Sequence, residues 1–277
     1  MNPASLTARL VTKVTSVDRH QEEDLLAIEE PLEIRLLCGE YKKSVSITMR
    51  TPGFDAELAA GFLFTEGLVR NREAIETIEG CGPKIGSHGG QNIVRVQLKP
   101  GTPTPDLKVE RHFFMTSSCG ICGKASLEAL EVHRREPFPT LGPAFDSDVI
   151  HTLPKALMVA QAVFEKTGGL HAAGLFDETG NLLNVHEDVG RHNAVDKAIG
   201  CQFLKGNLPL FNRILFVSGR ASFELMQKAL MAGIPTLAAV GAPSSLAVEL
   251  ASKFNMTLLG FVRDQRFNIY YGGWRLR

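Results

Sequence analysis

The sequence predicts a mixed α/β protein in which a smaller N-terminal α/β domain precedes a C-terminal three-layer domain. The second half alternates helical and strand-like segments, an order typical of a sheet covered by helices on both faces. The first half opens instead with a hairpin pattern. Between them, residues 100–118 are rich first in Pro, Gly and Thr and then in Thr and Ser, which indicates a junction near residue 110.

In the first half, residues 32–50 contain two apolar runs around a turn at 39–43 and predict a β-hairpin. Asp55 is suited to cap a helix that stops at Gly67. Residues 93–98 return to the alternation of a strand. We therefore expect a small domain over 1–110.

In the second half, residues 153–165 predict a helix that ends at the following glycines, and a second hairpin surrounds the turn D-E-T-G-N. Helices then alternate with three apolar strands, RILFVS, TLAAV and LLGFVR. We expect this domain over 147–277, and a mobile segment over 111–146 that carries a C-x-x-C pair.

The composition excludes several classes of protein. The 277 residues include 30 basic and 30 acidic side chains, so no net charge draws the chain to nucleic acid or an anionic membrane. The first residues lack the apolar core of a signal peptide, and no stretch approaches the roughly 18 apolar residues of a membrane span. We expect a cytoplasmic protein without nucleic-acid or membrane partners. The five scattered cysteines are unlike a structural disulfide framework.

Cys119 and Cys122 lie in the Gly- and Ser-rich run S-S-C-G-I-C-G. A helix-compatible segment follows, and a helix N-terminus together with Lys124 favours the thiolate form of a nearby cysteine. The pair suits reactive sulfur, although thiols without a role remain the simpler interpretation.

Two other uses of the pair are weaker. A structural zinc site needs four ligands, so histidines such as His171, His186 or His192 would have to complete it. Thioredoxin-like exchange usually places Trp or Pro beside the pair, whereas the sole tryptophan is Trp274.

Residues 185–197, V-H-E-D-V-G-R-H-N-A-V-D-K, join a predicted strand to a predicted helix. An open α/β sheet commonly binds its ligand at such a junction. The chemically active side chains there are Glu187, Asp188, Arg191, His192 and Asp196. A capped, salt-bridged helix start explains the same pattern equally well.

Two later junctions, F-V-S-G-R-A-S-F-E and A-V-G-A-P-S-S-L-A, each lead from an apolar strand into a helix. Their backbone N–H groups and side chains suit phosphate, although Gly and Ser are also ordinary turn residues. The side chains are Ser218, Arg220, Ser222, Ser244 and Ser245. Beyond the last strand, Phe261, Arg263, Arg266 and Phe267 combine aromatic faces with guanidinium groups, which can stack on a purine and hold its phosphates.

Taken together, the segments of the chain resemble the formate dehydrogenase accessory sulfurtransferase (FdhD) family from about residue 30 onward. The matching segments are MRTPGFDAELAAGFLFTEGLV, SSCGICGKASLEAL, TGGLHAAGLF, HEDVGRHNAVDKAIG, VSGRASFELMQKALMAGIP, GAPSSLAVELA and TLLGFVR. The resemblance implies a sulfur carrier that accepts persulfide sulfur from a cysteine desulfurase. It passes this sulfur to the molybdenum or tungsten bis-molybdopterin guanine dinucleotide cofactor before the cofactor enters formate dehydrogenase.

The resemblance also assigns roles to residues. Cys119 matches the persulfide-bearing cysteine and Cys122 the second cysteine of the motif, with a relay or a resolving role. The matching cofactor-binding segment is Phe261, Val262, Arg263, Asp264, Gln265 and Arg266, where Asp-Gln replaces the Pro-Gly of some members. A homodimer is compatible with the family.

The resemblance further implies a cytidine-deaminase-like fold for the C-terminal half. Zinc deaminases use H-x-E and P-C-x-x-C at two helix starts, but here these starts read H-E-D-V-G and S-G-R-A-S-F-E, without cysteine. We therefore expect no metal ligands. Two alternative functions are a non-catalytic cofactor-binding chaperone and a zinc-binding, deaminase-like hydrolase.

Overall fold

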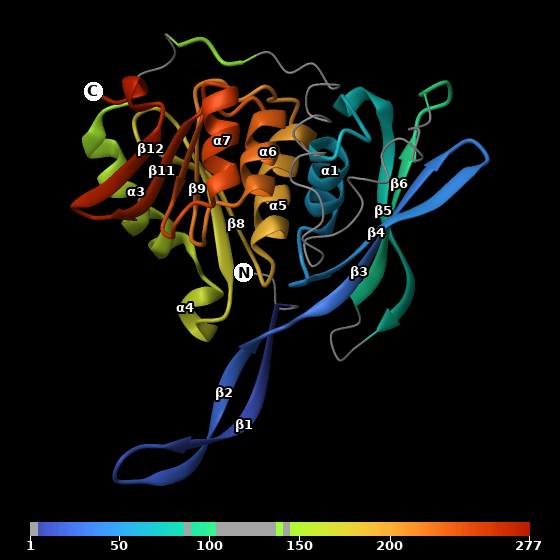
Figure 1. Ribbon diagram of the computed structural model, residues 1–277. Coiled ribbons are helices and arrows are strands. Elements are labelled where there is room, and N and C mark those ends of the chain that lie inside the picture. Colours follow the sequence, from blue (N-terminus) through green and yellow to red (C-terminus); the bar gives the residue numbers. More distant parts are fainter. Residues whose placement is uncertain (1–4, 86–89, 104–136, 141–144) are drawn as a thin grey trace.

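The computed structural model describes residues 5–85, 90–103, 137–140 and 145–277 (Figure 1). Strands and helices alternate in a mixed α/β fold, which confirms the predicted class. Cys119, Cys122 and the junction expected near residue 110 lie outside the described residues. The boundaries at 110 and 146 therefore stay predictions. Among the described residues, no helix is long and apolar enough to cross a membrane.

The first sheet has four strands in the order β4-β3-β6-β5. The predicted hairpin is formed by β3 and β4, and the predicted strand at 93–98 belongs to β6. The sequence patterns did not indicate β5, whose polar and Gly-containing residues hide a strand. The elements of this region are β3 (Glu30–Cys38), β4 (Tyr41–Arg50), α1 (Asp55–Thr65), a short 3₁₀ turn (Arg72–Ala74), β5 (Ile75–Ile85) and β6 (Gly90–Leu98).

The expected role of Asp55 as a helix cap is wrong. Phe54 is the N-cap of α1 and has a left-handed backbone with φ of 57°. Asp55 is the first helical residue, and both of its carboxylate oxygens accept hydrogen bonds of 3.0 Å from the guanidinium of Arg50. A buried arginine needs such partners, and this contact takes the carboxylate away from the cap.

The second sheet has six strands in the order β12-β11-β10-β9-β7-β8. The predicted hairpin and the three later strands are present. The helix expected over 153–165 instead starts at 147, where the side chain of Asp146 accepts from the Asp148 N–H, and ends at 160 before the short α4. The elements are α3 (Ser147–Ala160), α4 (Phe164–Thr167), β7 (His171–Phe176), β8 (Leu182–Asp188), α5 (Arg191–Leu204), β9 (Ile214–Val217), α6 (Phe223–Met231), β10 (Thr236–Ala239), α7 (Ser245–Lys253), β11 (Thr257–Arg263), β12 (Arg266–Tyr271) and a 3₁₀ turn (Gly273–Arg275).

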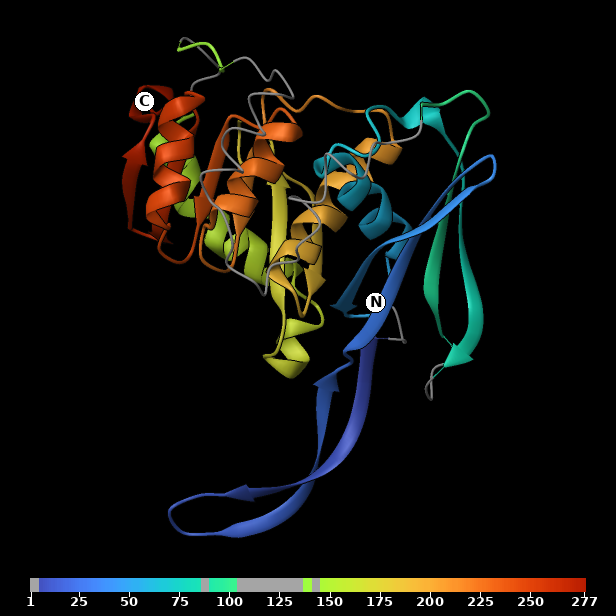
Figure 2. The same ribbon diagram turned by 45° about the vertical axis from the view of Figure 1, so that its right-hand side comes forward.

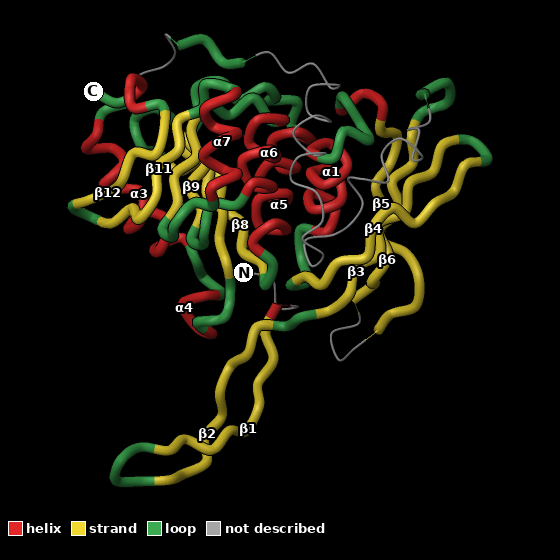
Figure 3. The backbone as a smooth tube through the Cα atoms, in the orientation of Figure 1, coloured by secondary structure: helices red, strands yellow, loops and turns green. Residues whose placement is uncertain are grey.

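Helices cover both faces of this sheet (Figure 3). Along β9, Leu215 and Val217 join the core formed with α5, α6 and α7, whereas Ile214 and Phe216 join a second core with α3. Side chains alternate between the faces of a strand, so a run of four apolar residues fits a strand that is buried on both sides. The cytidine-deaminase-like assignment of this region stays a prediction.

Helices α1 and α5 lie against each other and join the two sheets into one core (Figures 1 and 2). Ten residues of α5 are buried, including Asp196 and Lys197, because the helix is enclosed by its own sheet on one side and by α1 on the other. A helix covered from two sides lacks the polar stripe of a surface helix. The contact therefore fixes the orientation of α5, whose first turn belongs to the site described below.

An antiparallel hairpin of β1 (Leu6–Val14) and β2 (Arg19–Ala27) projects from the body (Figure 2). Its root is held by Ser5, whose hydroxyl donates a 2.9 Å hydrogen bond to the Pro52 carbonyl. The sequence patterns did not reveal this arm, because its charged residues conceal the alternation of a strand.

Candidate functional site

The candidate site lies at one edge of the six-stranded sheet. Strands β9, β10 and β11 are mutually parallel, and β8 runs in the same direction because two antiparallel pairings through β7 connect it to β9. Their carboxyl ends consequently meet at one edge, where open α/β sheets bind ligands. The first turns of α5, α6 and α7 follow three of these strand ends. Free backbone N–H groups at helix N-termini favour an anion.

The loops after β9 and β10 and the end of β11 form a continuous backbone layer. The Gly241 N–H donates to the Gly219 carbonyl at 2.9 Å, and the Phe261 N–H donates to the Gly241 carbonyl at 3.1 Å. A Cβ on Gly241 would lie 3.0 Å from the Gly219 oxygen, so a side chain at this position would crowd the loop after β9. The two strand-to-helix junctions that the sequence suggests for phosphate binding are therefore neighbours in space.

The predicted serines of these junctions differ in what they contact. The Ser218 hydroxyl accepts from the Ala172 N–H at 2.9 Å, and the Ser244 hydroxyl accepts from the Ala247 N–H at 3.2 Å as the cap of α7. Ser222 is the N-cap residue of α6 and makes no side-chain cap bond. Ser245 and Arg220 are exposed at the same edge. Ser218 and Ser244 thus order the loops, while Arg220 provides a positive charge.

Arg191 and two histidines add to this charge. A Cβ on Gly219 would lie 3.4 Å from Nδ1 of His171 and 3.8 Å from Cδ of Arg191, so both side chains border the loop after β9. His192 Nε2 lies 3.4 Å from the Ser222 hydroxyl and 3.8 Å from a Glu224 carboxylate oxygen.

Two pKa shifts report the electrostatics of this cluster. The neighbouring His192 side chain lowers the pKa of Glu224 to about 2, so Glu224 is ionised at neutral pH. Burial, followed by the charges of Arg191 and His192, lowers the pKa of His171 below its usual value. The charges of Arg191 and His192 that oppose protonation of His171 also favour an anionic ligand.

The guanidinium of Arg191 carries the clearest sign of a missing partner. Its Nε is buried and makes no hydrogen bond within the described residues. Buried donors are almost always paired, and an unpaired one costs about 1–3 kcal/mol. A ligand oxygen at this edge would satisfy it. The sequence does not distinguish Arg191 from the other charged residues of its motif, whereas the orphaned Nε does.

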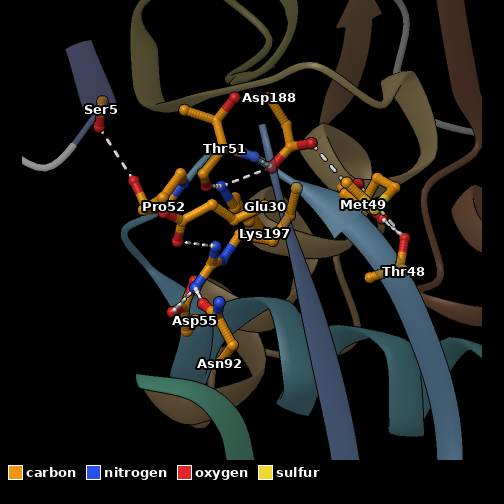
Figure 4. A network of polar contacts seen from close by, with 12 residues as sticks. Ser5, Glu30, Thr48, Met49, Thr51, Pro52, Asp55, Asn92, Asp188 and Lys197 are labelled. Carbon is orange, nitrogen blue, oxygen red and sulfur yellow. Dashed lines mark hydrogen bonds and ion pairs between the residues drawn. The ribbon is translucent and has the colours of Figure 1, made fainter. Parts of the chain in front are cut away.

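A buried ion pair holds the turn that precedes Arg191 (Figure 4). Lys197 Nζ lies 2.6 Å from Asp188 Oδ2 and donates to the Thr51 carbonyl at 2.9 Å. The same carboxylate accepts from the N–H groups of Thr51 at 3.2 Å and Gly190 at 2.8 Å. The network joins the loop after β4 to the start of α5, and so positions the first turn of that helix.

The residues of the 185–197 motif therefore divide into two groups. Asp188, Asp196 and Lys197 form buried ion pairs, as a salt-bridged helix start predicts, and Glu187 accepts from the N–H groups of Val163 and Phe164 to cap α4. Arg191 and His192 instead border the open edge.

The segment 261–266 comprises the last three residues of β11, the turn of Asp264 and Gln265, and the first residue of β12. Phe261 is 41% exposed and has φ of 52°, a strained value for an aromatic residue. Arg263 donates to the carbonyls of Val240 at 2.8 Å and Val262 at 2.9 Å. Val262 is buried, whereas Asp264, Gln265 and Arg266 are exposed. This segment borders the loop after β10 through the Phe261 N–H, so it continues the same edge.

Comparison with known proteins assigns the chain to a family. A sequence profile of the FdhD/NarQ family matches residues 27–277. The chain belongs to the FdhD/NarQ family. It is similar to proteins named sulfur carrier protein FdhD from Streptomyces avermitilis, with 50% identity over 91% of this chain and 89% of the relative, and from Mycobacterium tuberculosis, with 52% identity over 89% and 90%. A relative of the same name from Sulfurisphaera tokodaii is 44% identical over 94% of each chain.

A solved structure resembles the whole FdhD/NarQ chain. It is a protein from Desulfotalea psychrophila provisionally named a formate dehydrogenase accessory protein, with a TM-score of 0.74 and 25% identity over 98% of this chain and 99% of that chain. The expected family is therefore confirmed.

Of the three histidines considered as zinc ligands, His186 lies apart from His171 and His192. His186 is buried and its ring meets that of Phe54 edge-on at 4.7 Å, whereas His171 and His192 border the open edge. Within the described ranges, no group of three or more His, Cys, Asp or Glu side chains is arranged to hold a metal ion. The cysteines of the C-x-x-C pair lie outside these ranges.

Proposed function

We propose that this chain is a cytoplasmic sulfur carrier required for formate dehydrogenase activity. Cys119 accepts persulfide sulfur from a cysteine desulfurase, and the sulfur then passes to the molybdenum or tungsten bis-molybdopterin guanine dinucleotide cofactor. The loaded cofactor is afterwards inserted into formate dehydrogenase. Membership of the FdhD/NarQ family and the names of relatives at about 50% identity support this proposal.

The loading step is a thiol exchange. The Cys119 thiolate attacks the outer sulfur of the desulfurase persulfide, the S–S bond of that persulfide breaks, and the desulfurase cysteine leaves as a thiolate. Sulfur is transferred without net oxidation. The thiolate form is the nucleophile, so the Gly- and Ser-rich run before a helix-compatible segment suits Cys119.

Two roles remain open for Cys122. In the resolving role, its thiolate attacks Sγ of Cys119, the persulfide S–S bond breaks, and hydrosulfide leaves for the cofactor while the two cysteines form a disulfide. The dithiol supplies the two electrons of this step. In the relay role, Cys122 attacks the outer sulfur instead and becomes a persulfide itself.

The edge of the six-stranded sheet suits the guanine dinucleotide as cargo. Arg191, with its orphaned Nε, and Arg220 are cations that suit phosphate, beside the N-terminus of α6. Phe261 offers an exposed ring to a purine, and the carboxylate of Asp264 is the type of acceptor that guanine N–H groups require. The orphaned Arg191 atom is the structural observation that carries this assignment.

One experiment tests the sulfur chemistry directly. The protein is incubated with a cysteine desulfurase and cysteine, and its intact mass is measured under non-reducing conditions. We expect wild type to gain sulfur and Cys119→Ala not to gain it, with Cys201→Ala as a control that loads normally. An unchanged gain in Cys119→Ala would disprove the assignment. Normal formate dehydrogenase activation by the Cys119→Ala, Cys122→Ala variant would favour a non-catalytic chaperone instead.

A further inference from the structure

The guanidinium of Arg275 lies at the amino-terminal end of β11, the opposite end of this strand from the candidate site. Arg275 belongs to the 3₁₀ turn after β12 and is 1% exposed. Its Nη1 donates to the hydroxyl of Thr257, the first residue of β11, at 3.3 Å, and its Nη2 donates to the Pro139 carbonyl at 2.8 Å. The side chain thus joins three parts of the chain that are distant in sequence.

This buried cation has no carboxylate partner among the residues that the structure describes. Arg50, which is equally buried, contacts the carboxylates of Asp55 and Glu30. Arg275 instead donates to two neutral oxygens and lies 5.8 Å from the ring of Trp274, which compensates a charge only weakly. Burial lowers the pKa of Arg275 below its usual value, as expected for a cation without a counter-charge. Arginine nevertheless stays protonated in proteins, so the charge itself remains.

Two buried polar atoms near this guanidinium make no hydrogen bond within the described ranges. They are Nε of Arg275 itself and the hydroxyl oxygen of Thr236. Thr236 is paired with Thr257 in the parallel register of β10 and β11, so the two side chains leave the same face of the sheet, about 4.8 Å apart. The Thr257 hydroxyl donates its hydrogen to the Gly272 carbonyl at 2.7 Å and accepts from Arg275. Both orphaned groups are therefore neighbours of the Thr257 side chain.

The two orphaned groups require a partner that accepts hydrogen bonds, because an Nε–H and a hydroxyl can both donate. A water molecule would accept from both, but it would leave the guanidinium without a counter-charge, and an uncompensated buried charge is strongly destabilising. A small anion would accept both hydrogen bonds and also neutralise the charge. Thr236, Thr257 and Arg275 are each at most 1% exposed, so the site is closed and suits a monatomic ion better than a phosphate or a carboxylate.

We propose that the Nε–H of Arg275 and the hydroxyl of Thr236 bind a chloride ion. The ion stabilises the fold at the end of the sheet away from the candidate site, so it is independent of the proposed sulfur chemistry. The same guanidinium holds the Pro139 carbonyl, and the adjacent Phe138 N–H donates to the Phe254 carbonyl at 3.0 Å. Neutralising Arg275 therefore strengthens the attachment of residues 137–140 to the C-terminal half of the chain.

The first test is thermal unfolding of the full chain, with chloride replacing gluconate at constant ionic strength. We expect the melting temperature to rise with chloride and then to saturate, because an ion that binds only the folded protein stabilises it by mass action. Thr236→Val removes one hydrogen bond to the ion and should raise the apparent chloride dissociation constant about fivefold or more. Thr77→Val changes an exposed threonine of β5 in the same way and should leave this constant within about twofold. A wild type that does not respond to chloride, or an unchanged constant in Thr236→Val, would overturn the proposal.

Two further measurements locate the ion. Arg275→Gln removes the buried charge and should abolish the dependence of the melting temperature on chloride; if this variant does not fold, the comparison of Thr236→Val with Thr77→Val still decides. Bromide scatters anomalously, so crystals of the protein soaked in bromide should show an anomalous peak between Arg275 Nε and the Thr236 hydroxyl. Chloride dependence that persists in Arg275→Gln, an anomalous peak only beside Arg191, or a water at the site without anomalous signal would each overturn the proposal.

Discussion

Gly61 and Gly200 meet where α1 crosses α5, and there is no room for a side chain on either. A Cβ on Gly61 would lie 1.9 Å from the Asp196 carbonyl oxygen, and one on Gly200 would lie 1.9 Å from the Glu57 carbonyl oxygen. The two helices are therefore in backbone contact. This contact joins the four-stranded sheet to the helix whose first turn borders the candidate site.

We expect Gly200→Ala to destabilise the protein by about 3 kcal/mol, because the methyl group forces two packed helices apart. Helix propensity alone predicts the opposite sign, since Ala is favoured over Gly by about 1 kcal/mol within a helix. Urea denaturation followed by circular dichroism distinguishes these outcomes. Gly90→Ala is the control, because a Cβ there meets nothing within 4 Å and φ is not positive. A stabilised Gly200→Ala variant would contradict the close approach.

The buried pair of Lys197 and Asp188 leads to a second prediction. Asp188→Asn leaves the ammonium of Lys197 buried without a counter-charge, and we expect a loss of roughly 3–5 kcal/mol in the free energy of unfolding. Adding Lys197→Met should recover part of this loss. Arg213→Met, which breaks the exposed pair with Glu178, should cost no more than about 1 kcal/mol. Similar losses at the buried and exposed pairs would show that burial of the first pair has little energetic effect.

Arg191 should control binding of the nucleotide part of the cofactor. We expect Arg191→Gln to weaken binding of GDP about tenfold or more, because it removes a charge-assisted contact to phosphate. Isothermal titration calorimetry with GDP measures this change. Arg213→Gln, which precedes β9 at the opposite end of that strand from the site and is paired with Glu178, serves as a control for the loss of a positive charge. Unchanged affinity in Arg191→Gln would remove this residue from the proposed site without affecting the assignment of Cys119.

The resolving and relay roles of Cys122 predict different sulfur products. If Cys122 resolves the persulfide, Cys122→Ser loads sulfur on Cys119 but releases no hydrosulfide, since no internal thiol can displace it. If Cys122 is a relay, a trapped persulfide is found at either cysteine of wild type by peptide mass analysis. Loss of loading in Cys122→Ser would contradict both roles, because Cys119 alone accepts the sulfur in each.

His186 should make stability depend on pH. Burial lowers its pKa from 6.5 to about 4 in the folded protein. Between these values the unfolded chain binds the additional proton, so stability rises with pH and is lost as the pH falls from 6.5 towards 4. The full loss amounts to about 3 kcal/mol. Urea midpoints across this range should fall less steeply in His186→Gln than in wild type, and parallel curves would contradict a neutral buried ring.

Periodicity was sufficient to predict the later strands and helices of the chain. Residues 214–217 and 236–239 are buried on both faces, so continuous apolar runs identify them without any knowledge of the partner strands. The arm and β5 escaped prediction because the alternation that marks a strand depends on a covering partner. In the arm, charged residues line one face and much of the other is exposed.

The sequence by itself determined the family, the C-x-x-C pair and the two junctions that end in helix starts, since each depends on residues that are close along the chain. Only the tertiary structure decided which side chains of the 185–197 motif are internal. It buries Asp188 against Lys197 and, within the described part of the chain, leaves Arg191 Nε unpaired at the edge, because α1 packs along α5 whereas Arg191 begins this helix at the carboxyl end of β8. Burial depends on neighbours that are distant in sequence, and local pattern does not contain that information.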